Sequence, residues 1–336
     1  MAKIRIAING FGRIGRNAFK IANTKANIDI VAINDLTDNA TLAHLLRHDS
    51  NYGHYHKKVS SDKTHLIVDG KRIAVFAEKD PAQLPWKKLN IDVVIESTGF
   101  FTNHEGLELH LKAGAKKVVL SAPEKPDEDH DTFVIGANED QLKSDHKIIS
   151  NASCTTNCIA PIMAVLTKEL GVEKSLMTTV HSYTASQALQ DAPNKDLREA
   201  RSAAINIVPT KTGAATAAAL TVPALKDKFD GLSIRVPTPV VSLSDITFLT
   251  KRNTSIEEIN KIIKQACGTT HKGVIDCTEE ELVSRDFVGD THSCIVDLKL
   301  TNVVAGNLCK VVAWYDNEWG YSNRLVEMVQ KVGAKK

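Results

Sequence analysis

The sequence lacks a long apolar run, an excess of one charge and a regular cysteine pattern. Its 336 residues carry 42 lysines and arginines against 40 aspartates and glutamates, a formal net charge of +2. This balance favours neither nucleic acid nor a membrane surface as a partner. No stretch approaches the roughly 18–20 consecutive apolar residues of a membrane-spanning helix. Residues 2–8, AKIRIAI, also lack the apolar region of a signal peptide, so we expect a cytoplasmic protein.

The six cysteines are too few and too irregularly spaced for a disulfide framework. No CxxC motif predicts a zinc site, and we expect no metal. Cys154 and Cys158 lie close together, and the others are scattered. The close pair leaves three interpretations open: a redox or metal pair, ordinary core packing, or one reactive thiol beside an inert one.

Two kinds of pattern divide the chain near residue 150. Before it, strand-like runs such as 3–8, 29–33 and 93–98 alternate with helix-like segments. Strand–helix–strand repetition predicts an α/β domain with a doubly wound, Rossmann-type parallel sheet. Residues 65–78 differ, because two short strands around Asp69-Gly70 predict a hairpin.

The second half has longer strand-like segments joined by turns. Helical patterns interrupt them at 155–170, 212–226 and 255–267. This order predicts an α+β domain with a mixed, largely antiparallel sheet. The last stretch is amphipathic and predicts a C-terminal helix.

A glycine-rich turn follows the first strand. INGFGRIGR carries Gly10, Gly12 and Gly15 in GxGxxG spacing. These glycines permit a tight turn, close approach of a pyrophosphate and close packing of helix on strand. Asp35, twenty residues after Gly15, ends a second strand, where a carboxylate accepts from ribose hydroxyls and repels a 2′-phosphate. The pattern favours NAD over NADP; the alternative is an ordinary glycine turn beside a solvent-facing Asp35.

The two close cysteines differ in their predicted positions. Ser153 is a suitable N-cap for the helix that follows, and Gly171 a suitable stop. Cys154 then lies in the first turn, where free amides and the helix dipole lower the pKa of a thiol. Cys158 lies one turn further in and is expected to be buried. Taken alone, Cys154 fits a nucleophile and a structural cysteine equally well.

A cysteine nucleophile needs a base, and His181 is the candidate among twelve histidines. It ends the apolar run MTTV and precedes a long polar loop. Sites are often built where a strand leads into a loop. Without further evidence, a histidine with ordinary structural partners is the more common alternative.

Six motifs considered together resemble one enzyme family. INGFGRIGR, SNASCTTNC, TTVHSYT, PTKTGAA, IRVPTPVVS and WYDNEWGYS, in this order, resemble phosphorylating glyceraldehyde-3-phosphate dehydrogenase over essentially the whole chain. The resemblance implies an NAD-binding domain at 1–152, completed by a helix at 318–336, and a catalytic domain at 153–317. It also implies a homotetramer with the 182–208 loop and strands of the second domain at the subunit contacts.

The resemblance implies an oxidoreductase of glycolysis and gluconeogenesis. It would oxidise D-glyceraldehyde 3-phosphate with NAD and inorganic phosphate to 1,3-bisphosphoglycerate. Cys154 would be the nucleophilic thiolate and His181 its base. A covalent thioester on the cysteine conserves the energy of oxidation until phosphate attacks it.

The matched positions also imply ligands. The substrate phosphate would contact Thr184 and Arg235. The inorganic phosphate would contact Ser153, Thr155, Thr212 and Gly213. Beyond the glycines and Asp35, the cofactor would contact Arg13, Ile14, Lys79, Ser121 and Asn317. The sequence departs from many bacterial members at DLREAR, where Glu199 replaces the second of two arginines. Three alternatives stay open for the anion site: Arg198, Arg201 or no loop arginine at all.

Two other functions stay open. An erythrose-4-phosphate dehydrogenase shares the fold and the thiolate chemistry but releases a free acid, and the complete inorganic-phosphate set speaks against it. A nucleotide-binding or adhesion protein without catalysis would be expected to lose the thiol or its base, and both are present.

Overall fold

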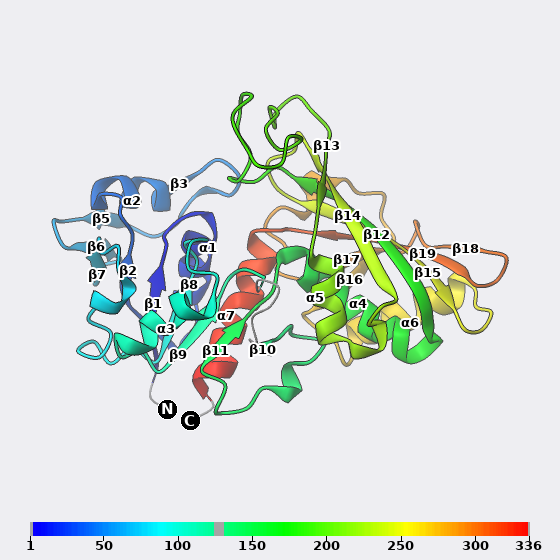
Figure 1. Cartoon of the computed structure of the whole chain (residues 1–336), viewed down its shortest axis with the longest axis horizontal. Helices are drawn as coiled ribbons and strands as arrows, with labels where there is room; N and C mark the ends of the chain where they lie inside the picture. The colour runs from blue at the N-terminus through cyan, green and yellow to red at the C-terminus, as the bar shows by residue number, and fades with distance from the viewer. Residues whose placement is uncertain (1–2, 124–130, 335–336) are drawn as a thin grey trace. The chain divides into compact units, whose positions relative to one another are not determined.

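The computed structural model of the protein describes residues 3–123 and 131–334. The chain divides into two compact units (Figure 1). The first contains Met1–Phe133, Asp140–Ala152 and Ser322–Lys336, and the second contains Val134–Glu139 and Ser153–Tyr321.

The first unit is built on a sheet with the strand order β10-β11-β9-β8-β1-β2-β7-β6-β5. Its parallel strands are β1 (Ile4–Asn9), β2 (Ile28–Asn34), β7 (Lys71–Phe76), β8 (Val93–Glu96), β9 (Lys117–Leu120), β10 (Asp131–Thr132) and β11 (Ile148–Ser150). The chain runs outward from β1 in both directions, which confirms the predicted doubly wound sheet.

The predicted hairpin is also present in this unit. β6 (His65–Val68) pairs antiparallel with β7 and with β5 (Val59–Ser61). Asp69 and Gly70 between β6 and β7 have φ of 48° and 81°. Two successive left-handed residues match the twist of the flanking strands.

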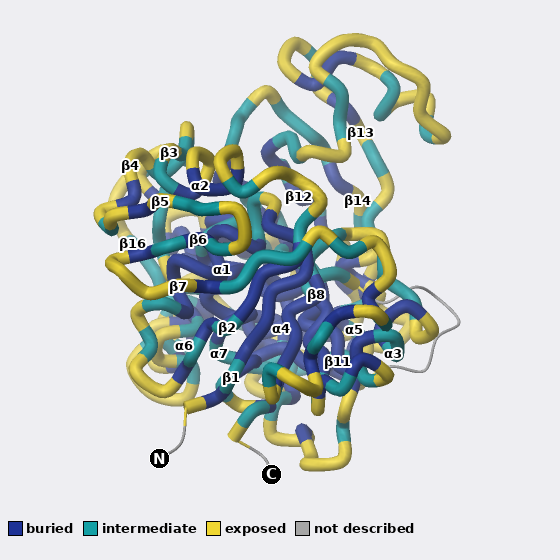
Figure 2. The backbone as a smooth tube through the Cα atoms, turned by 90° about the vertical axis from the view of Figure 1, so that its left-hand side faces the viewer, coloured by how far each residue is buried: buried dark blue, intermediate teal, exposed yellow. Residues whose placement is uncertain are grey.

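Helices accompany the sheet of the first unit. They are α1 (Arg13–Ala22), α2 (Asn39–Arg47), α3 (His104–Lys112) and α7 (Trp319–Ala334), of which the part from Ser322 onward belongs to this unit. A small separate ribbon pairs β3 (His48–Asp49) with β4 (Gly53–His54). Ile6, Ile8 and Ile33 are fully buried in the central strands, whose backbone is the dark interior of Figure 2. Parallel strands covered on both faces require such apolar runs.

The second unit contains the predicted mixed sheet, ordered β13-β14-β12-β15-β19-β17-β16 with β18 beside β19. Among the described strands of this second sheet, only the pairs β12–β14 and β16–β17 are parallel. The strands are β12 (Val172–Ser182), β13 (Val208–Lys211), β14 (Phe229–Val236), β15 (Ser242–Thr250), β16 (Ile275–Thr278), β17 (Cys294–Asp297), β18 (Asn302–Val304) and β19 (Leu308–Tyr315).

The helices of this unit are α4 (Cys154–Leu170), α5 (Ala214–Thr221) and α6 (Ile256–Gly268). The Ser153 hydroxyl accepts a hydrogen bond from Thr156 N at 3.0 Å, and Gly171 has a left-handed φ of 69°, so both predicted ends of α4 are confirmed. The helix predicted at 212–226 is shorter than expected. It ends at Thr221 because Val222 precedes Pro223 and leaves the helical conformation.

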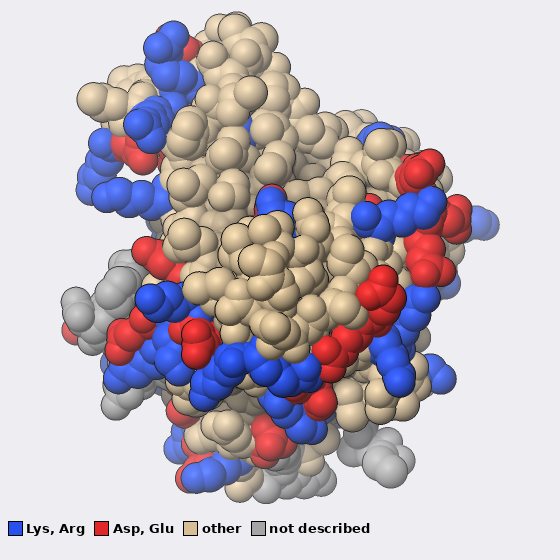
Figure 3. Space-filling model, turned by 90° about the vertical axis from the view of Figure 1, so that its right-hand side faces the viewer, with Lys and Arg blue, Asp and Glu red and all other residues tan. Residues whose placement is uncertain are grey.

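A long loop, residues 183–207, joins β12 to β13 and projects from the second unit with most of its backbone exposed (Figures 1 and 2). On the face drawn in Figure 3, side chains of both signs lie to either side of and below a broad area in which charged side chains are sparse. Within the described residues, no helix has the length and hydropathy to cross a membrane.

Candidate active site

The second unit brings together the predicted nucleophile and base. Cys154 opens α4, and His181 is the penultimate residue of β12. Cys154 Sγ lies 3.4 Å from His181 Nε2. His181 is buried, whereas Cys154 is partly exposed and accessible to a small substrate. This is the spacing expected of a thiol and the base that removes its proton. Cys158 is fully buried, as predicted.

Arg235 lies beside this pair because of strand register. β12 and β14 run parallel with His181 directly opposite Arg235. Arg235 Nη1 approaches His181 Nδ1 to 2.5 Å and the Ser182 carbonyl oxygen to 3.2 Å. Its Nε is buried and has no hydrogen-bond partner among the described residues. A guanidinium with an unused donor is a suitable anion ligand.

His181 Nδ1 has two competing neighbours. Besides the Arg235 donor, the Ser182 carbonyl oxygen lies 2.7 Å away and only accepts. A proton on Nδ1 satisfies Ser182 and leaves Nε2 to accept the thiol proton. A lone pair on Nδ1 satisfies Arg235 and leaves the proton on Nε2. Only the first tautomer makes His181 a base toward Cys154.

The electrostatics differ from the sequence prediction at Cys154. Burial and the Arg235 charge lower the pKa of His181 to about 3, so the imidazole is neutral at pH 7. Burial also raises the pKa of Cys154, opposed by Arg235 and by hydrogen bonds from Thr155. The expected lowering by the helix terminus is therefore wrong, because desolvation of the thiolate outweighs it.

Tyr315, which the sequence did not indicate as a site residue, packs against the site from the buried side. Its hydroxyl lies 2.9 Å from Thr155 Oγ1 and 2.8 Å from Thr179 Oγ1, and its ring meets the His181 ring edge-on. The Thr155 hydroxyl is thus directed into the protein interior. The signal was weak, because Tyr315 is only one aromatic residue at the end of a predicted strand.

Asn317 has a fixed amide orientation. Its Oδ1 accepts hydrogen bonds from Ser182 Oγ at 3.0 Å and Ser242 Oγ at 3.1 Å. The oxygen is therefore engaged, and the Nδ2 group remains as the donor.

The other predicted anion ligands begin helices or follow strands. Ser153 is the N-cap of α4, and Gly213 is the N-cap of α5. The Thr212 hydroxyl accepts from Ala214 N at 3.2 Å. Thr184 follows β12, with its hydroxyl 2.9 Å from Ser186 Oγ. Helices α4 and α5 pack together, and the amides at helix starts attract anions.

The loop arginines have different surroundings. Arg201 Nε pairs with Asp191 at 2.8 Å. Arg198 lines an open groove of about 670 Å³ together with Lys211 and Thr212. Glu199, which lies between them, accepts a hydrogen bond from the Thr210 hydroxyl at 2.7 Å. Arg198 is thus the loop arginine beside a predicted phosphate ligand.

In the first unit, the glycine turn has the required geometry. Gly10 has φ of 88°, and a Cβ there would lie 2.6 Å from Thr98 N. A Cβ at Gly15 would lie 2.1 Å from the Gly10 carbonyl oxygen, whereas one at Gly12 would meet nothing within 4 Å. The turn is therefore tight, α1 sits close to β1, and space remains open at Gly12 for a ligand.

Comparison with known proteins agrees with this geometry. The model of the glyceraldehyde 3-phosphate dehydrogenase NAD binding domain matches residues 4–104, and that of the C-terminal domain matches residues 153–317. A glyceraldehyde-3-phosphate dehydrogenase of Thermotoga maritima is 55% identical over 97% of this chain and 98% of its own. One of Priestia megaterium is 50% identical over 99% of both chains.

The chain belongs to the glyceraldehyde-3-phosphate dehydrogenase family. The predicted family, the α/β class and the NAD-dependent oxidoreductase activity in glycolysis are confirmed.

The residues of the first unit fit the NAD of this dehydrogenase family. Gly12 is the N-cap of α1 and has no side chain to cap the first-turn amides, which include Ile14. The Arg13 side chain turns to Asp49 at 2.9 Å. Asp35 follows β2 and accepts from Phe11 N at 2.7 Å and Thr37 N at 2.9 Å. An anion-binding helix start beside a fixed carboxylate suits a pyrophosphate and its ribose.

Lys79 and Ser121 complete the predicted cofactor positions of this dehydrogenase. Lys79 is exposed after β7, and Ser121 follows β9 and donates its N–H to Glu96 O at 2.9 Å. Both therefore lie beyond the carboxyl ends of parallel strands, where open α/β sheets bind ligands.

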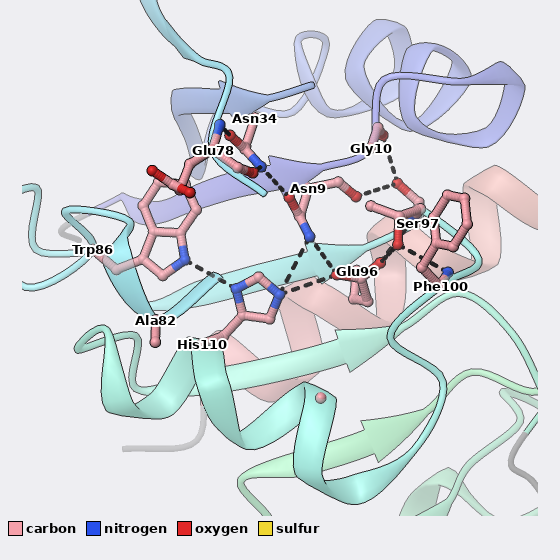
Figure 4. A network of polar contacts seen from close by, with 12 residues as sticks. Asn9, Gly10, Asn34, Glu78, Ala82, Trp86, Glu96, Ser97, Phe100 and His110 are labelled. Atoms are coloured by element: carbon pink, nitrogen blue, oxygen red, sulfur yellow. Dashed lines mark hydrogen bonds and ion pairs between the residues drawn. The ribbon is translucent and has the colours of Figure 1, made fainter. Parts of the chain in front are cut away.

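A buried carboxylate supports the glycine turn (Figure 4). Glu96, fully buried at the end of β8, accepts from Asn9 Nδ2 at 2.6 Å and contacts His110 Nε2 at 3.0 Å. Its other oxygen accepts from Thr98 N and from the Thr98 hydroxyl. Trp86 Nε1 only donates, so His110 Nδ1 accepts at 3.1 Å and its Nε2 donates to Glu96. Asn9 and Thr98, which lie next to Gly10, are thus held by the same Glu96 side chain.

Proposed function

We propose that this dehydrogenase converts D-glyceraldehyde 3-phosphate, NAD and inorganic phosphate to 1,3-bisphosphoglycerate. The observation that supports it most directly is the 3.4 Å approach of Cys154 Sγ to His181 Nε2 at the start of α4. NAD, when bound, supplies the hydride acceptor.

Cys154 forms and later breaks the covalent bond to the substrate. Its thiol proton moves to His181 Nε2 as sulfur bonds to the aldehyde carbon, giving a hemithioacetal. His181 Nε2 passes this proton on to the former carbonyl oxygen, which becomes the hydroxyl of the hemithioacetal. The neutral imidazole then accepts the hydroxyl proton again as the carbon is oxidised to a thioester, its hydride going to the NAD that would be bound. Attack by inorganic phosphate breaks the S–C bond, releases the acyl phosphate and returns the thiolate. The Cys154 amide at the helix start stabilises the oxyanion.

Arg235 and Thr184 bind the substrate phosphate in this proposal. The unused, buried Nε of Arg235 is a donor for the phosphate oxygens. A phosphate also neutralises the charge that lowers the pKa of His181 and competes with His181 for Nη1. Substrate binding thereby releases Nδ1 to Ser182 and makes Nε2 the base.

The inorganic phosphate binds between helix starts. We assign it to the hydroxyls and amides of Ser153, Thr155, Thr212 and Gly213, with Arg198 as the additional cation. The support is the location of these residues at the starts of α4 and α5. Thr155 contributes its amide, because its hydroxyl contacts Tyr315.

For the cofactor, we assign the first-turn amides of Arg13 and Ile14 to the pyrophosphate and Asp35 to the adenosine ribose. Lys79 and Ser121 are assigned to the adenosine side. Asn317 would donate from Nδ2 to the nicotinamide carboxamide and so orient the nicotinamide ring for hydride transfer. Its engaged Oδ1 supports this direction.

We also propose a cytoplasmic homotetramer whose NAD-binding domain, 1–152, is completed by the helix 318–336, with catalytic domain 153–317. Within the first unit, Lys117 Nζ donates to Val332 O at 3.2 Å, and Gly333 lies against Ile4. These contacts support the C-terminal helix as part of that domain.

The decisive experiment measures NADH formation from glyceraldehyde 3-phosphate with and without inorganic phosphate. We expect NADH formation to depend on phosphate or arsenate and to be slower with erythrose 4-phosphate or NADP. Oxidation that proceeds equally well without phosphate would contradict the proposal and indicate hydrolysis to a free acid.

A further inference from the structure

Two thiols and a carboxylate meet between α6 and β16 in the second unit. Cys267 lies in the last turn of α6, and Asp276 and Cys277 lie on β16. One ligand atom from each residue lies within 4.8 Å of the other two. Among residues 3–123 and 131–334, this is the one group of three or more histidine, cysteine or acidic side chains that close together. The dehydrogenase chemistry uses none of these residues.

The local backbone explains why consecutive residues face one site. Neighbouring side chains in a strand normally point to opposite faces. Here Asp276 turns back along β16, and its Oδ1 accepts from Cys277 N at 2.8 Å. One carboxylate oxygen is thus fixed by the backbone, and the other is available to a ligand. β16 is the last strand in its sheet order, and α6 packs against it.

The donor set of the group suits a bound cation. It combines two sulfur atoms with a carboxylate oxygen. The nearby Lys264 ammonium pairs with Glu279 at 2.7 Å. All three ligand residues are partly exposed, so an ion can reach them. A divalent cation would replace the thiol protons and compensate the negative charges.

We propose that Cys267, Asp276 and Cys277 bind one thiophilic divalent cation of the zinc class, with water as the fourth ligand. Thiolates at about 2.3 Å and a carboxylate oxygen at about 2.0–2.2 Å from zinc place tetrahedral ligands roughly 3.5–4 Å apart. The three ligand atoms of the group lie within 4.8 Å of one another, so only small movements would bring them to this spacing. Magnesium and calcium prefer sets made only of oxygen ligands, and two sulfur donors select against them.

The cation joins the end of α6 to the edge strand of the sheet. It closes the chain between residues 267 and 277 through three side chains. Because a site assembled from two elements exists only in the folded protein, binding stabilises the second unit.

The test uses the full chain with Cys154→Ser, which removes the exposed thiol of the active site from metal titrations. We expect Co²⁺ to produce a thiolate-to-cobalt charge-transfer absorption that saturates at one equivalent and disappears when Zn²⁺ displaces it. Adding Cys267→Ser or Cys277→Ser abolishes the absorption. Adding Cys309→Ser, which alters a buried cysteine outside the group, preserves it.

Two further measurements keep the outcome decisive if one cysteine variant folds poorly. Asp276→Asn in the Cys154→Ser chain should weaken Zn²⁺ binding by more than about tenfold, since even outer partners of a metal ligand contribute that much. Zn²⁺ should raise the thermal unfolding midpoint of the Cys154→Ser chain and leave that of the Cys267→Ser double variant unchanged. Absence of the cobalt band, or its survival without Cys267, overturns the proposal.

Discussion

At the scale of single residues, the two neighbouring cysteines differ in exposure and in their surroundings. Cys154 is partly exposed beside His181, whereas Cys158 is fully buried in α4. One helical turn separates the two cysteines, and only Cys154 lies beside His181 at the start of the helix.

Cys154→Ser should therefore lower kcat by at least about 10⁴-fold, the scale seen when a covalent nucleophile is removed. Cys158→Ser should keep most of kcat and lose about 1–3 kcal/mol of unfolding free energy, because it buries a hydroxyl. Steady-state kinetics and urea unfolding measure the two effects. Equal losses of kcat would contradict the assignment.

His181 gives the protein a specific pH dependence. Because burial and Arg235 lower its pKa to about 3, the unfolded chain binds a proton between about pH 6.5 and 3 that the folded protein does not. Its contribution to unfolding free energy therefore falls as the pH drops through this window and is constant above it. His181→Gln should remove that dependence, and urea unfolding at several pH values measures it. If the unfolding free energies of the native chain and of His181→Gln changed with pH in the same way, the role assigned to His181 would be contradicted.

Arg198 and Arg201 provide a matched pair of substitutions. Arg198→Ala should raise the KM for inorganic phosphate about tenfold, equal to one charge-assisted hydrogen bond. Arg201→Ala should leave it nearly unchanged, because Arg201 already pairs with Asp191 on the surface. Initial rates measured against phosphate concentration, with the aldehyde and NAD saturating, give the KM for phosphate of each variant. A larger effect from Arg201 would assign the loop cation to that residue.

At the scale of elements, the sequence predicted the features that residues close together in the chain determine. The ends of α4 followed from Ser153 and Gly171, and the parallel sheet followed from alternating patterns. The extent of α5 was missed because Pro223 decided it. Long-range polar partners were not visible, since nothing near Glu96 in the sequence indicates its contact with His110 or with Asn9. The pKa of Cys154 was missed for the same reason, because burial is a property of the assembled fold.

The contacts of Glu96 with Asn9 and His110 join β8 to β1 and α3 next to the glycine turn. Glu96→Gln places an NH₂ group among donors, so we expect a loss of about 1–3 kcal/mol in unfolding free energy. The Kd for NAD should rise as well, because Asn9 and Thr98 lose a shared anchor. Urea unfolding and calorimetric NAD titration measure both. Glu108→Gln, on the exposed face of α3, is the control, and similar behaviour of the two variants would argue against the network.

At the scale of the whole molecule, several large apolar side chains of the second unit are exposed on one loop and the sheet beside it. Leu197 is 81% exposed and Ile205 is 80% exposed in the 183–207 loop, and Leu176 on β12 is 66% exposed. Solitary exposed leucines are ordinary, but several on one loop and its neighbouring sheet indicate an interface. The same loop carries Arg198 and Arg201, so an assembly through this loop would bear on the proposed phosphate site.

We expect the native chain to have the mass of a tetramer by light scattering. Leu197→Asp combined with Ile205→Asp should dissociate it, because two carboxylates cannot be buried unpaired at a subunit contact. Leu36→Asp, at a position 60% exposed in the first unit, should leave the mass unchanged and controls for the added charge. If the loop variants stay tetrameric, the loop lies outside the contacts; if the native chain is a monomer, the exposed leucines serve another purpose. Loss of activity upon dissociation would further indicate that the subunit contacts hold the phosphate-binding loop in place.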